Sequence, residues 1–135
     1  MLFPKNTKYK KLHKNKNNYV KKNYNNLLNF AFFAIKSLGF IRLSSKLLNI
    51  ILFKTQGVSK KITKIWLLAF PNKSATKKKE KARMGKGVGS FYRWFCYIKV
   101  GQVIFEFEST TKLLALRVLI KVQQLIPIKL RLLNT

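Results

Sequence analysis

The strongest constraint on this chain is its charge imbalance. Of its 135 residues, 29 are lysine or arginine and 3 are acidic, which gives a formal net charge of +26. The acidic residues are Glu80, Glu106 and Glu108, so no carboxylate side chain occurs before residue 80. Like charges at this density oppose compaction unless an anion neutralises them. The sequence therefore predicts a polyanionic partner, which is either nucleic acid or an acidic membrane surface.

The chain nevertheless contains enough apolar residues to form a core. Hydrophobic residues make up 47% of it, too many for a simple disordered polymer, and its length suits one domain. We expect a basic arm over residues 1–26, then a single domain over residues 27–135 with a basic glycine-rich loop at 72–90. Helical and strand-like segments interleave, which predicts the α+β class: a small antiparallel or mixed sheet packed against two helices.

An enzyme is not expected from the residues available. The only histidine, His13, lies in a basic run, and the only cysteine, Cys96, lies in an aromatic strand pattern. A cysteine–histidine nucleophile pair has no evident third residue to orient the histidine, and these two side chains cannot complete a four-ligand zinc site. We predict no catalytic residue, metal site, cofactor or small-molecule substrate. Cys96 should be a buried small hydrophobe, far from His13.

A membrane-spanning protein is not expected either. The longest apolar stretch, residues 27–40, contains Lys36 and is shorter than the ~20 residues that a spanning helix needs. Cations stand where a signal peptide would have its apolar core, so we expect the basic start to belong to the mature protein. The alternative function is a basic protein associated with a membrane surface, anchored by Phe32, Phe33 and the apolar helix at 46–54.

Capping residues, glycines and prolines predict the order of the elements. A helix should run from Ser44 or Ser45 to about Lys54 and stop at Gly57, whereas residues 27–43 do not distinguish strand from loop. The other expected elements are a strand at 62–70, a loop at 72–82, a hairpin of strands at 91–100 and 102–108, a helix from Thr110 or Thr111 to about 125, and a strand at 128–132.

Several side chains have predicted positions within these elements. Leu113, Leu116 and Ile120 should face inward from the second helix, at helical spacing. Val103, Phe105 and Phe107 should share one face of the second hairpin strand. Trp66 and Trp94 are expected in the core.

Glycine stands at every second position of the segment Arg83-Met84-Gly85-Lys86-Gly87-Val88-Gly89-Ser90. The spacing fits neither a P-loop nor a dinucleotide fingerprint. Glycine lets a backbone approach RNA closely and adopt positive φ. Arg83 could place two donors on a phosphate or a guanine edge, and Lys86 could supply a point charge. A flexible turn with incidental cations is equally compatible with the pattern.

The basic arm interleaves lysines with Tyr9, Tyr19 and Tyr24 and has no helical or strand period. A charge run is usually a solvated tail. The interleaved aromatic residues favour instead an arm that orders on phosphate, with tyrosines stacking on bases or riboses.

Four segments resemble one family, ribosomal protein sixteen of bacterial and organellar large subunits. The opening Met-Leu-Phe-Pro-Lys-Asn-Thr-Lys-Tyr-Lys-Lys-Leu-His-Lys is similar to that family's M-L-x-P-K-R-T-K-[FY]-R-K-x-H-[KR]. Lys64-Ile65-Trp66 with Phe70-Pro71-Asn72-Lys73 resembles its K-I-W…F-P-D-K. Arg83-Met84-Gly85-Lys86-Gly87 matches R-M-G-K-G, and Leu125-Ile126-Pro127-Ile128-Lys129 resembles L-P-I-K.

The resemblance implies a structural constituent of the large ribosomal subunit. Its partners would be large-subunit rRNA near the peptidyl-transferase centre, the A-site and P-site tRNAs, and neighbouring ribosomal proteins. The loop toward the tRNA ends would be Arg83, Met84, Gly85, Lys86 and Gly87, acting through RNA geometry and supplying no catalytic group. The expected rRNA-binding residues are Lys5, Lys8, Lys10, Lys11, His13, Lys14, Lys16, Lys36, Arg42 and Lys73.

Composition suggests where such a protein works. Lys, Asn, Ile, Phe and Tyr are abundant whereas Ala, Arg, Gly and Pro are scarce, which is typical of an A+T-rich coding sequence. With the start read as native, we expect an organelle-encoded protein of the mitochondrial matrix, in the large subunit of the mitoribosome. A reduced plastid is the alternative.

Overall fold

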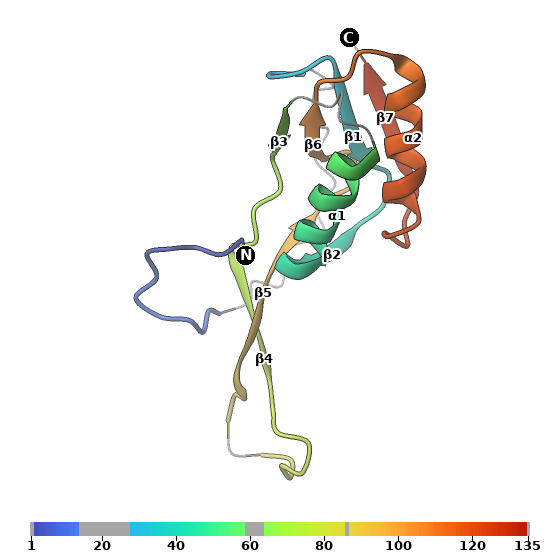
Figure 1. Ribbon diagram of the computed structural model, residues 1–135. Coiled ribbons are helices and arrows are strands. Elements are labelled where there is room, and N and C mark those ends of the chain that lie inside the picture. The colour runs from blue at the N-terminus through green and yellow to red at the C-terminus, as the bar shows by residue number, and fades with distance from the viewer. Residues whose placement is uncertain (1, 14–27, 59–63, 86, 135) are drawn as a thin grey trace.

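The computed structural model describes residues 2–13, 28–58, 64–85 and 87–134. These residues form two helices and two antiparallel sheets, which confirms the predicted α+β class (Figure 1). In chain order the elements are β1 (Phe33–Ser37), β2 (Ile41–Ser44), α1 (Ser45–Val58), β3 (Ile65–Leu67), β4 (Lys73–Lys77), β5 (Ser90–Ile98), β6 (Val103–Phe107), α2 (Lys112–Gln123) and β7 (Leu130–Asn134).

The strands divide into a four-stranded sheet of order β3-β6-β1-β7 and a three-stranded sheet of order β2-β5-β4. The predicted hairpin of β5 with β6 is therefore wrong, because the two strands belong to different sheets. Gly101 does turn the chain, with φ of 83°. Its N–H donates to the carbonyl of Ser37 at 2.8 Å, and the Ser37 N–H donates to the carbonyl of Gln102 at 3.0 Å. These bonds tie the turn to the end of β1, so the chain crosses into the other sheet.

Strand β4 occupies part of the segment 72–82 that was predicted to be a loop. Lys73 pairs with Phe95 and Lys77 pairs with Ser90. Its burial follows no strict alternation, and Lys77 is exposed. A strand without a clean buried face has no hydrophobic period, so pairing with the aromatic strand β5, and not local sequence, creates it.

Helix α1 begins as predicted and ends later. The Leu47 N–H donates to the Ser44 hydroxyl at 3.3 Å, which makes Ser44 a capping residue. The helix continues through Gly57 to Val58, so Gly57 does not end it. Only one side of this apolar helix is buried: Leu48 is fully buried, whereas Phe53 is 73% exposed.

Helix α2 is capped by Thr111, whose hydroxyl accepts the Leu114 N–H. The predicted inward face is wrong, because Leu113, Leu116 and Ile120 are all exposed. The buried face instead consists of Ala115, Val118 and Val122. Both stripes have helical spacing, and the smaller residues allow a closer approach of the helix to its neighbours α1 and β7.

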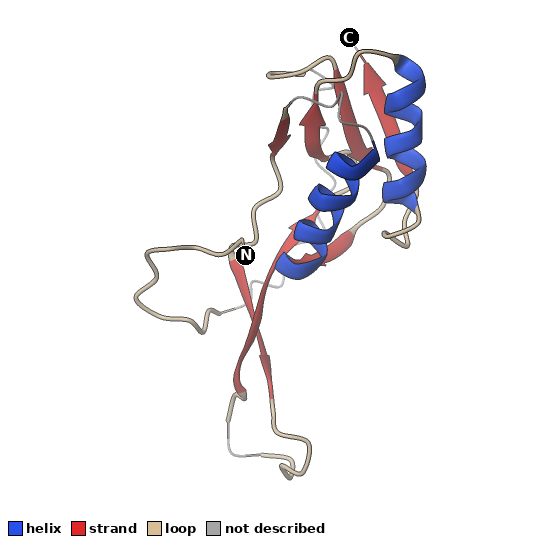
Figure 2. Cartoon of the chain, in the orientation of Figure 1, coloured by secondary structure: helices blue, strands red, loops and turns tan. Residues whose placement is uncertain are grey.

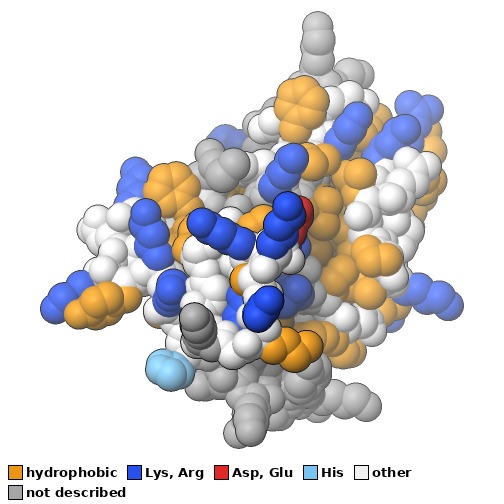
Figure 3. All heavy atoms as spheres, turned by 90° about the horizontal axis from the view of Figure 1, so that it is seen from below, with side chains coloured by type: hydrophobic (Ala, Val, Ile, Leu, Met, Phe, Trp, Pro, Cys, Tyr) orange, Lys and Arg blue, Asp and Glu red, His pale blue; other side chains and the backbone are white. Residues whose placement is uncertain are grey.

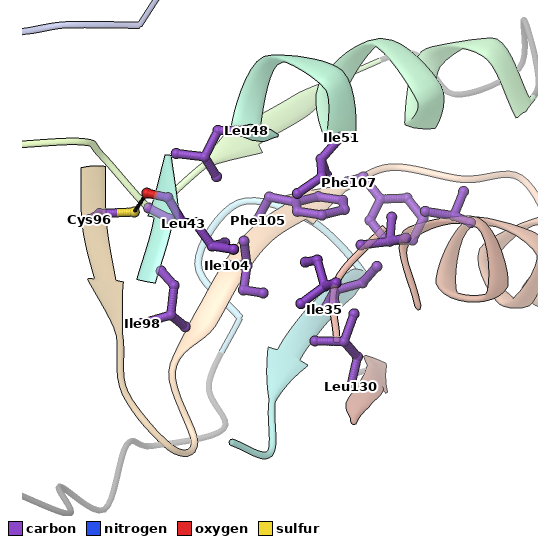
Figure 4. Packing of buried hydrophobic residues seen from close by; sticks show 14 of the residues in the cluster. Ile35, Leu43, Leu48, Ile51, Cys96, Ile98, Ile104, Phe105, Phe107 and Leu130 are labelled. Carbon is purple, nitrogen blue, oxygen red and sulfur yellow. Dashed lines mark hydrogen bonds between the residues drawn. The ribbon is translucent and has the colours of Figure 1, made fainter. Parts of the chain in front are cut away.

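The core lies between the helices and the sheets (Figure 4). Leu48 and Ile51 of α1 point toward Ile35, Leu43 and other buried residues of the strands, and α2 adds its small-residue face. Cys96 belongs to this cluster, as predicted, and its Sγ–H donates to the Leu43 carbonyl at 3.8 Å. Burial raises the pKa of the Cys96 thiol to about 11. Such a thiol is unreactive at neutral pH.

The other face of the four-stranded sheet is covered by the segment that enters β1. Glu106, on β6 and 1% exposed, accepts the N–H groups of Asn29, Phe30 and Ala31. The Phe30 ring stacks on Trp66, with centroids 6.2 Å apart. Both faces of β6 are therefore buried, beyond the one face predicted, and Trp66 is only half-buried. Trp94 is buried as expected.

Two further strands are shifted from their predicted limits. Of the strand expected at 62–70, only Ile65–Leu67 is a strand, and residues 62 and 63 lie outside the described chain. The N–H groups of Leu68 and Ala69 still both donate to the Ile104 carbonyl. The last strand begins at Leu130 and ends at Asn134.

Candidate nucleic-acid interface

A two-stranded ribbon of β4 and β5 extends away from the helices and the four-stranded sheet (Figure 2). Residues 78–85 and 87–89 belong to the loop at its tip, which contains the glycine-rich segment identified from the sequence and the lysines before it. At the base of the ribbon, β5 pairs with β2, and Leu43 lies in the core. The fold thus anchors the base of the ribbon in the core and places its tip away from the core.

Two glycines of this loop adopt the positive φ that their residue type permits. Gly85 has φ of 96° and Gly87 has φ of 78°, in the left-handed region that side chains disfavour. The Lys78 ammonium donates to the Gly85 carbonyl at 2.5 Å across the loop. At Gly89 a Cβ atom would lie 2.5 Å from the Lys77 carbonyl, so the two strands approach each other closely there.

The tip exposes its cations and one thioether. Arg83 is exposed and Met84 is fully exposed. A cleft of about 620 Å³ runs between the two sides of the loop, from Lys78 to Ser90. Glu80 is the one acidic residue among residues 72–90. Lys86, which the sequence analysis placed in this site, lies outside the described residues.

The basic arm lies against this ribbon. Residues 2–13 form neither helix nor strand, and the Leu12 N–H donates to the Ser74 hydroxyl of β4 at 3.1 Å. A cleft of about 320 Å³ between them is lined by Lys11, Leu12, His13, Ser74, Thr76 and Val88. Leu12 and Ser74 are 62 residues apart in sequence, and Lys11 and His13 share the cleft with Val88 of the loop. Two segments predicted separately therefore form one surface, which we call the arm–ribbon surface.

Figure 3 looks at this end of the molecule and shows lysine and arginine side chains around the loop, with very little acidic surface. Lys5, Lys8, Lys10, Lys11 and His13 of the arm are all exposed. Lys14 and Lys16 lie outside the described residues.

The remaining predicted rRNA-binding residues are distributed over both sheets. Arg42 and Lys73 come from β2 and β4, on either side of β5, and the Arg42 guanidinium lies 5.0 Å from the Phe95 ring centre. Lys36 is half-buried on β1 of the four-stranded sheet, where it pairs with Arg131 of β7. The fold therefore brings Lys73 to the base of the ribbon and places Lys36 elsewhere.

Two further exposed residues of the ribbon, Tyr92 and Arg93, were not predicted from the sequence to contact RNA. Both are exposed, and the Arg93 guanidinium lies 4.9 Å from the Tyr92 ring centre. They stand in an aromatic run that was interpreted as a strand with core residues. The arginine within that run was the available signal, since a charged residue next to an exposed ring seldom belongs to a core.

The proposed membrane anchors do not form one exposed face. Phe32 is exposed, but the Phe33 ring is stacked on Phe107, 6.0 Å between centroids, and Leu48 is fully buried. Within the described chain, neither helix combines the length and hydropathy that crossing a bilayer requires.

Comparison with known proteins gives consistent matches. The family model described as ribosomal protein L16p/L10e matches residues 4–133. Large ribosomal subunit protein uL16 of Blochmanniella pennsylvanica (strain BPEN) is 36% identical over 115 residues, covering 85% of this chain and 84% of that protein. The uL16 proteins of Blochmanniella floridana and Wigglesworthia glossinidia brevipalpis are 35% and 33% identical over the same length, covering 85% of this chain and 85% and 83% of their own. The family match includes the arm, both sheets and the glycine-rich loop.

Proposed function

The chain belongs to the ribosomal protein L16p/L10e family and is a structural constituent of the large ribosomal subunit. On this basis we propose that it binds rRNA near the peptidyl-transferase centre and helps to position A-site and P-site tRNA. The family is a structural part of the ribosome and not an enzyme family. Its partners in the subunit are rRNA and neighbouring ribosomal proteins.

The observation that carries the proposal is the arm–ribbon surface. Its cations come from two segments far apart in sequence, joined by the Leu12–Ser74 hydrogen bond and the shared cleft. Exposed lysines are point charges that neutralise phosphates without reading sequence. We propose that rRNA contacts are made by Lys5, Lys8, Lys10, Lys11, His13, Lys14, Lys16, Lys36, Arg42 and Lys73.

The tip of the ribbon is the part proposed to reach the tRNA ends. The residues concerned are Arg83, Met84, Gly85, Lys86 and Gly87. Arg83 carries a planar set of donors suited to a phosphate or a guanine edge. Gly85 and Gly87 have positive φ and no side chain, so an RNA backbone can approach this part of the loop closely. The Gly85 carbonyl itself already accepts the Lys78 ammonium.

We propose two functional parts within the chain: a basic rRNA-binding arm at residues 1–26, and a single domain at 27–135. The non-helical, non-strand conformation of residues 2–13 supports the first. One core cluster drawn from both helices and both sheets supports the second.

Two experiments test this function. Affinity for large-subunit rRNA should fall steeply with salt, with a log–log slope of roughly −0.7 to −0.9 per phosphate contact, and a flat response would contradict rRNA binding. In assembled ribosomes, Arg83→Ala should alter tRNA footprints more than Lys10→Ala does, because only the tip is proposed to touch tRNA. Equal effects of the two variants would remove the special role of the tip.

We further propose that the protein works in mitochondria, with a plastid as the alternative. Abundant Lys, Asn, Ile, Phe and Tyr support an A+T-rich coding sequence, as organelle genomes often have. The relatives reported above are bacterial. Immunodetection in purified mitochondria, plastids and cytosol tests the location, and a signal confined to a fraction without mitochondria would contradict it.

A further inference from the structure

A third cleft lies beside the ribbon, on the side of helix α1. It measures about 280 Å³, and its lining residues are Ser45, Lys46, Phe91, Tyr92, Arg93 and Trp94. It shares no lining residue with the cleft between arm and ribbon, and only borders the tip cleft, which ends at Ser90. The residues proposed above for rRNA or tRNA contact are all absent from its lining.

A β-bulge lies beside this cleft, at the lining residue Tyr92. Ala75 of β4 pairs with Arg93, but the next residue, Thr76, pairs with Phe91, so Tyr92 is the extra residue on β5. Bulges of this kind re-aim side chains and are common beside functional sites. Tyr92 is 53% exposed, which leaves much of its ring available to a ligand.

Two cations lie near the Tyr92 ring. The Arg93 guanidinium lies 4.9 Å and the Lys77 ammonium 5.7 Å from the Tyr92 ring centre. Lys46 adds an exposed ammonium from the first turn of α1. The described lining contains no carboxylate, and the nearest acid in sequence, Glu80, lies across the tip loop. A cleft with this charge favours an anion.

Two further aromatic rings line the cleft. The rings of Phe91 and Trp94 meet at 5.2 Å between centroids with a 55° tilt, and Trp94 is buried. Aromatic platforms flanked by cations bind single-stranded nucleic acid, because every base has a π-face and every phosphate a charge.

We propose that this cleft holds one unpaired ribonucleotide, with its base stacked against the Tyr92 ring and its phosphate bonded to Arg93 or Lys46. An arginine stacked on a ring keeps its edge N–H groups free, so Arg93 can serve the ring and the phosphate together. The inference rests on the proposed RNA-binding function and adds a specific site to it. The nucleotide comes either from rRNA or from a bound tRNA.

Chemical probing of unpaired bases in assembled large subunits, with and without tRNA, tests the proposal. Tyr92→Leu keeps an apolar side chain and removes the π-face. Loss of one base–aromatic stack should raise the reactivity of one nucleotide, or two adjacent ones, by about 5-fold or more. Arg93→Gln should expose the same nucleotide. The RNA in which that nucleotide lies distinguishes rRNA from tRNA.

Tyr9→Leu is the matched control, because Tyr9 is also exposed and has a lysine ammonium, that of Lys8, 5.6 Å from its ring centre. Tyr9 belongs to the proposed rRNA-binding arm, so any nucleotide that Tyr9→Leu exposes is assigned to the arm, and the Tyr92-dependent nucleotide must stay protected. Unchanged reactivity in both Tyr92→Leu and Arg93→Gln subunits, or a nucleotide exposed equally by Tyr9→Leu, would overturn the site. A failure of the proposed function would give a different result. The chemical reactivity of the rRNA bases would then be identical in subunits with the wild-type protein and in subunits without it.

Discussion

Glu106→Gln should destabilise the protein well beyond the effect of removing a charge. Glu106 lies on the central strand β6 and is 1% exposed. Its Oε2 accepts N–H groups from Asn29, Phe30 and Ala31 at 3.2, 2.7 and 3.2 Å, and its Oε1 faces the Asn29 N–H at 3.3 Å. Glutamine keeps the shape but replaces one oxygen by an NH₂ group, which cannot accept a hydrogen bond.

The magnitude follows from the three donors. A hydrogen bond to a charged group contributes about 1.5–3 kcal/mol, whereas one to a neutral group contributes about 0.5–1.5 kcal/mol. Each donor that keeps a neutral acceptor therefore loses about 1 kcal/mol. The three bonds share one carboxylate and are not additive, so we expect the free energy of unfolding to fall by about 2–3 kcal/mol.

Urea unfolding followed by tryptophan fluorescence measures this loss. The Trp66 ring is stacked on the Phe30 ring, and the Phe30 N–H donates to the Glu106 carboxylate. Hydrogen exchange of the Phe30 and Ala31 amides should accelerate in parallel. Glu80→Gln is the matched control: it removes the same charge from an exposed position in the tip loop. It should change the free energy of unfolding by less than about 0.5 kcal/mol.

Equal unfolding free energies for Glu106→Gln and Glu80→Gln, with unchanged exchange at Phe30, would refute this reasoning. The buried carboxylate would then contribute no more than its charge, and the segment entering β1 would be held by other contacts.

Three further predictions concern packing. Burial raises the pKa of Cys96 from 9.0 to about 11, so the thiol loses its proton at lower pH in the unfolded chain than in the folded one. The stabilising contribution of this thiol to the free energy of unfolding is complete below about pH 9 and falls between pH 9 and pH 11 by up to about 1.4 kcal/mol per pH unit. Cys96→Ala should lack this slope in urea titrations. Gly89→Ala should lower the free energy of unfolding by about 1–3 kcal/mol, because the added Cβ would meet the β4 backbone. Gly57→Ala in α1, where a Cβ would meet no neighbouring atom, should raise it by about 0.5–1 kcal/mol in the same assay. Val118→Ala should lower the free energy of unfolding by about 2 kcal/mol and Ile120→Ala by less than about 0.5 kcal/mol; the reverse order would restore the face of α2 predicted from the sequence.

Local signals predicted several element boundaries correctly, although Gly57 does not end α1 as expected. Ser44 and Thr111 cap the two helices, and Gly101 turns the chain at positive φ. The pairing of strands that are distant in sequence could not be predicted. Strand β4 exists because β5 pairs with it, and β6 joins β1 because Ser37 binds the turn at Gly101. The alternation of apolar and polar residues in these strands indicates neither contact.

The face of α2 illustrates a different limit. Its larger apolar residues suggested an inward stripe, but the smaller Ala115, Val118 and Val122 are buried. Residue size alone misleads here, because close packing between elements favours small side chains at the contact.

The candidate site was predictable in its chemistry and not in its assembly. The cations of the arm and the glycines of the loop were evident from residue types and spacing. Their common surface depends on the Leu12–Ser74 contact, which joins residues 62 positions apart. The exposed pair Tyr92 and Arg93 depends on a bulge, and a bulge is defined by the partner strand.

A density map of the large subunit from the source cells tests the central claim most directly. With tRNA bound, we expect RNA in contact with the backbone at Gly85 and with Lys11 and His13 of the arm, so that the arm–ribbon surface is enclosed by phosphates on both sides. A map in which the ribbon points into solvent, or is covered by protein alone, would contradict the account.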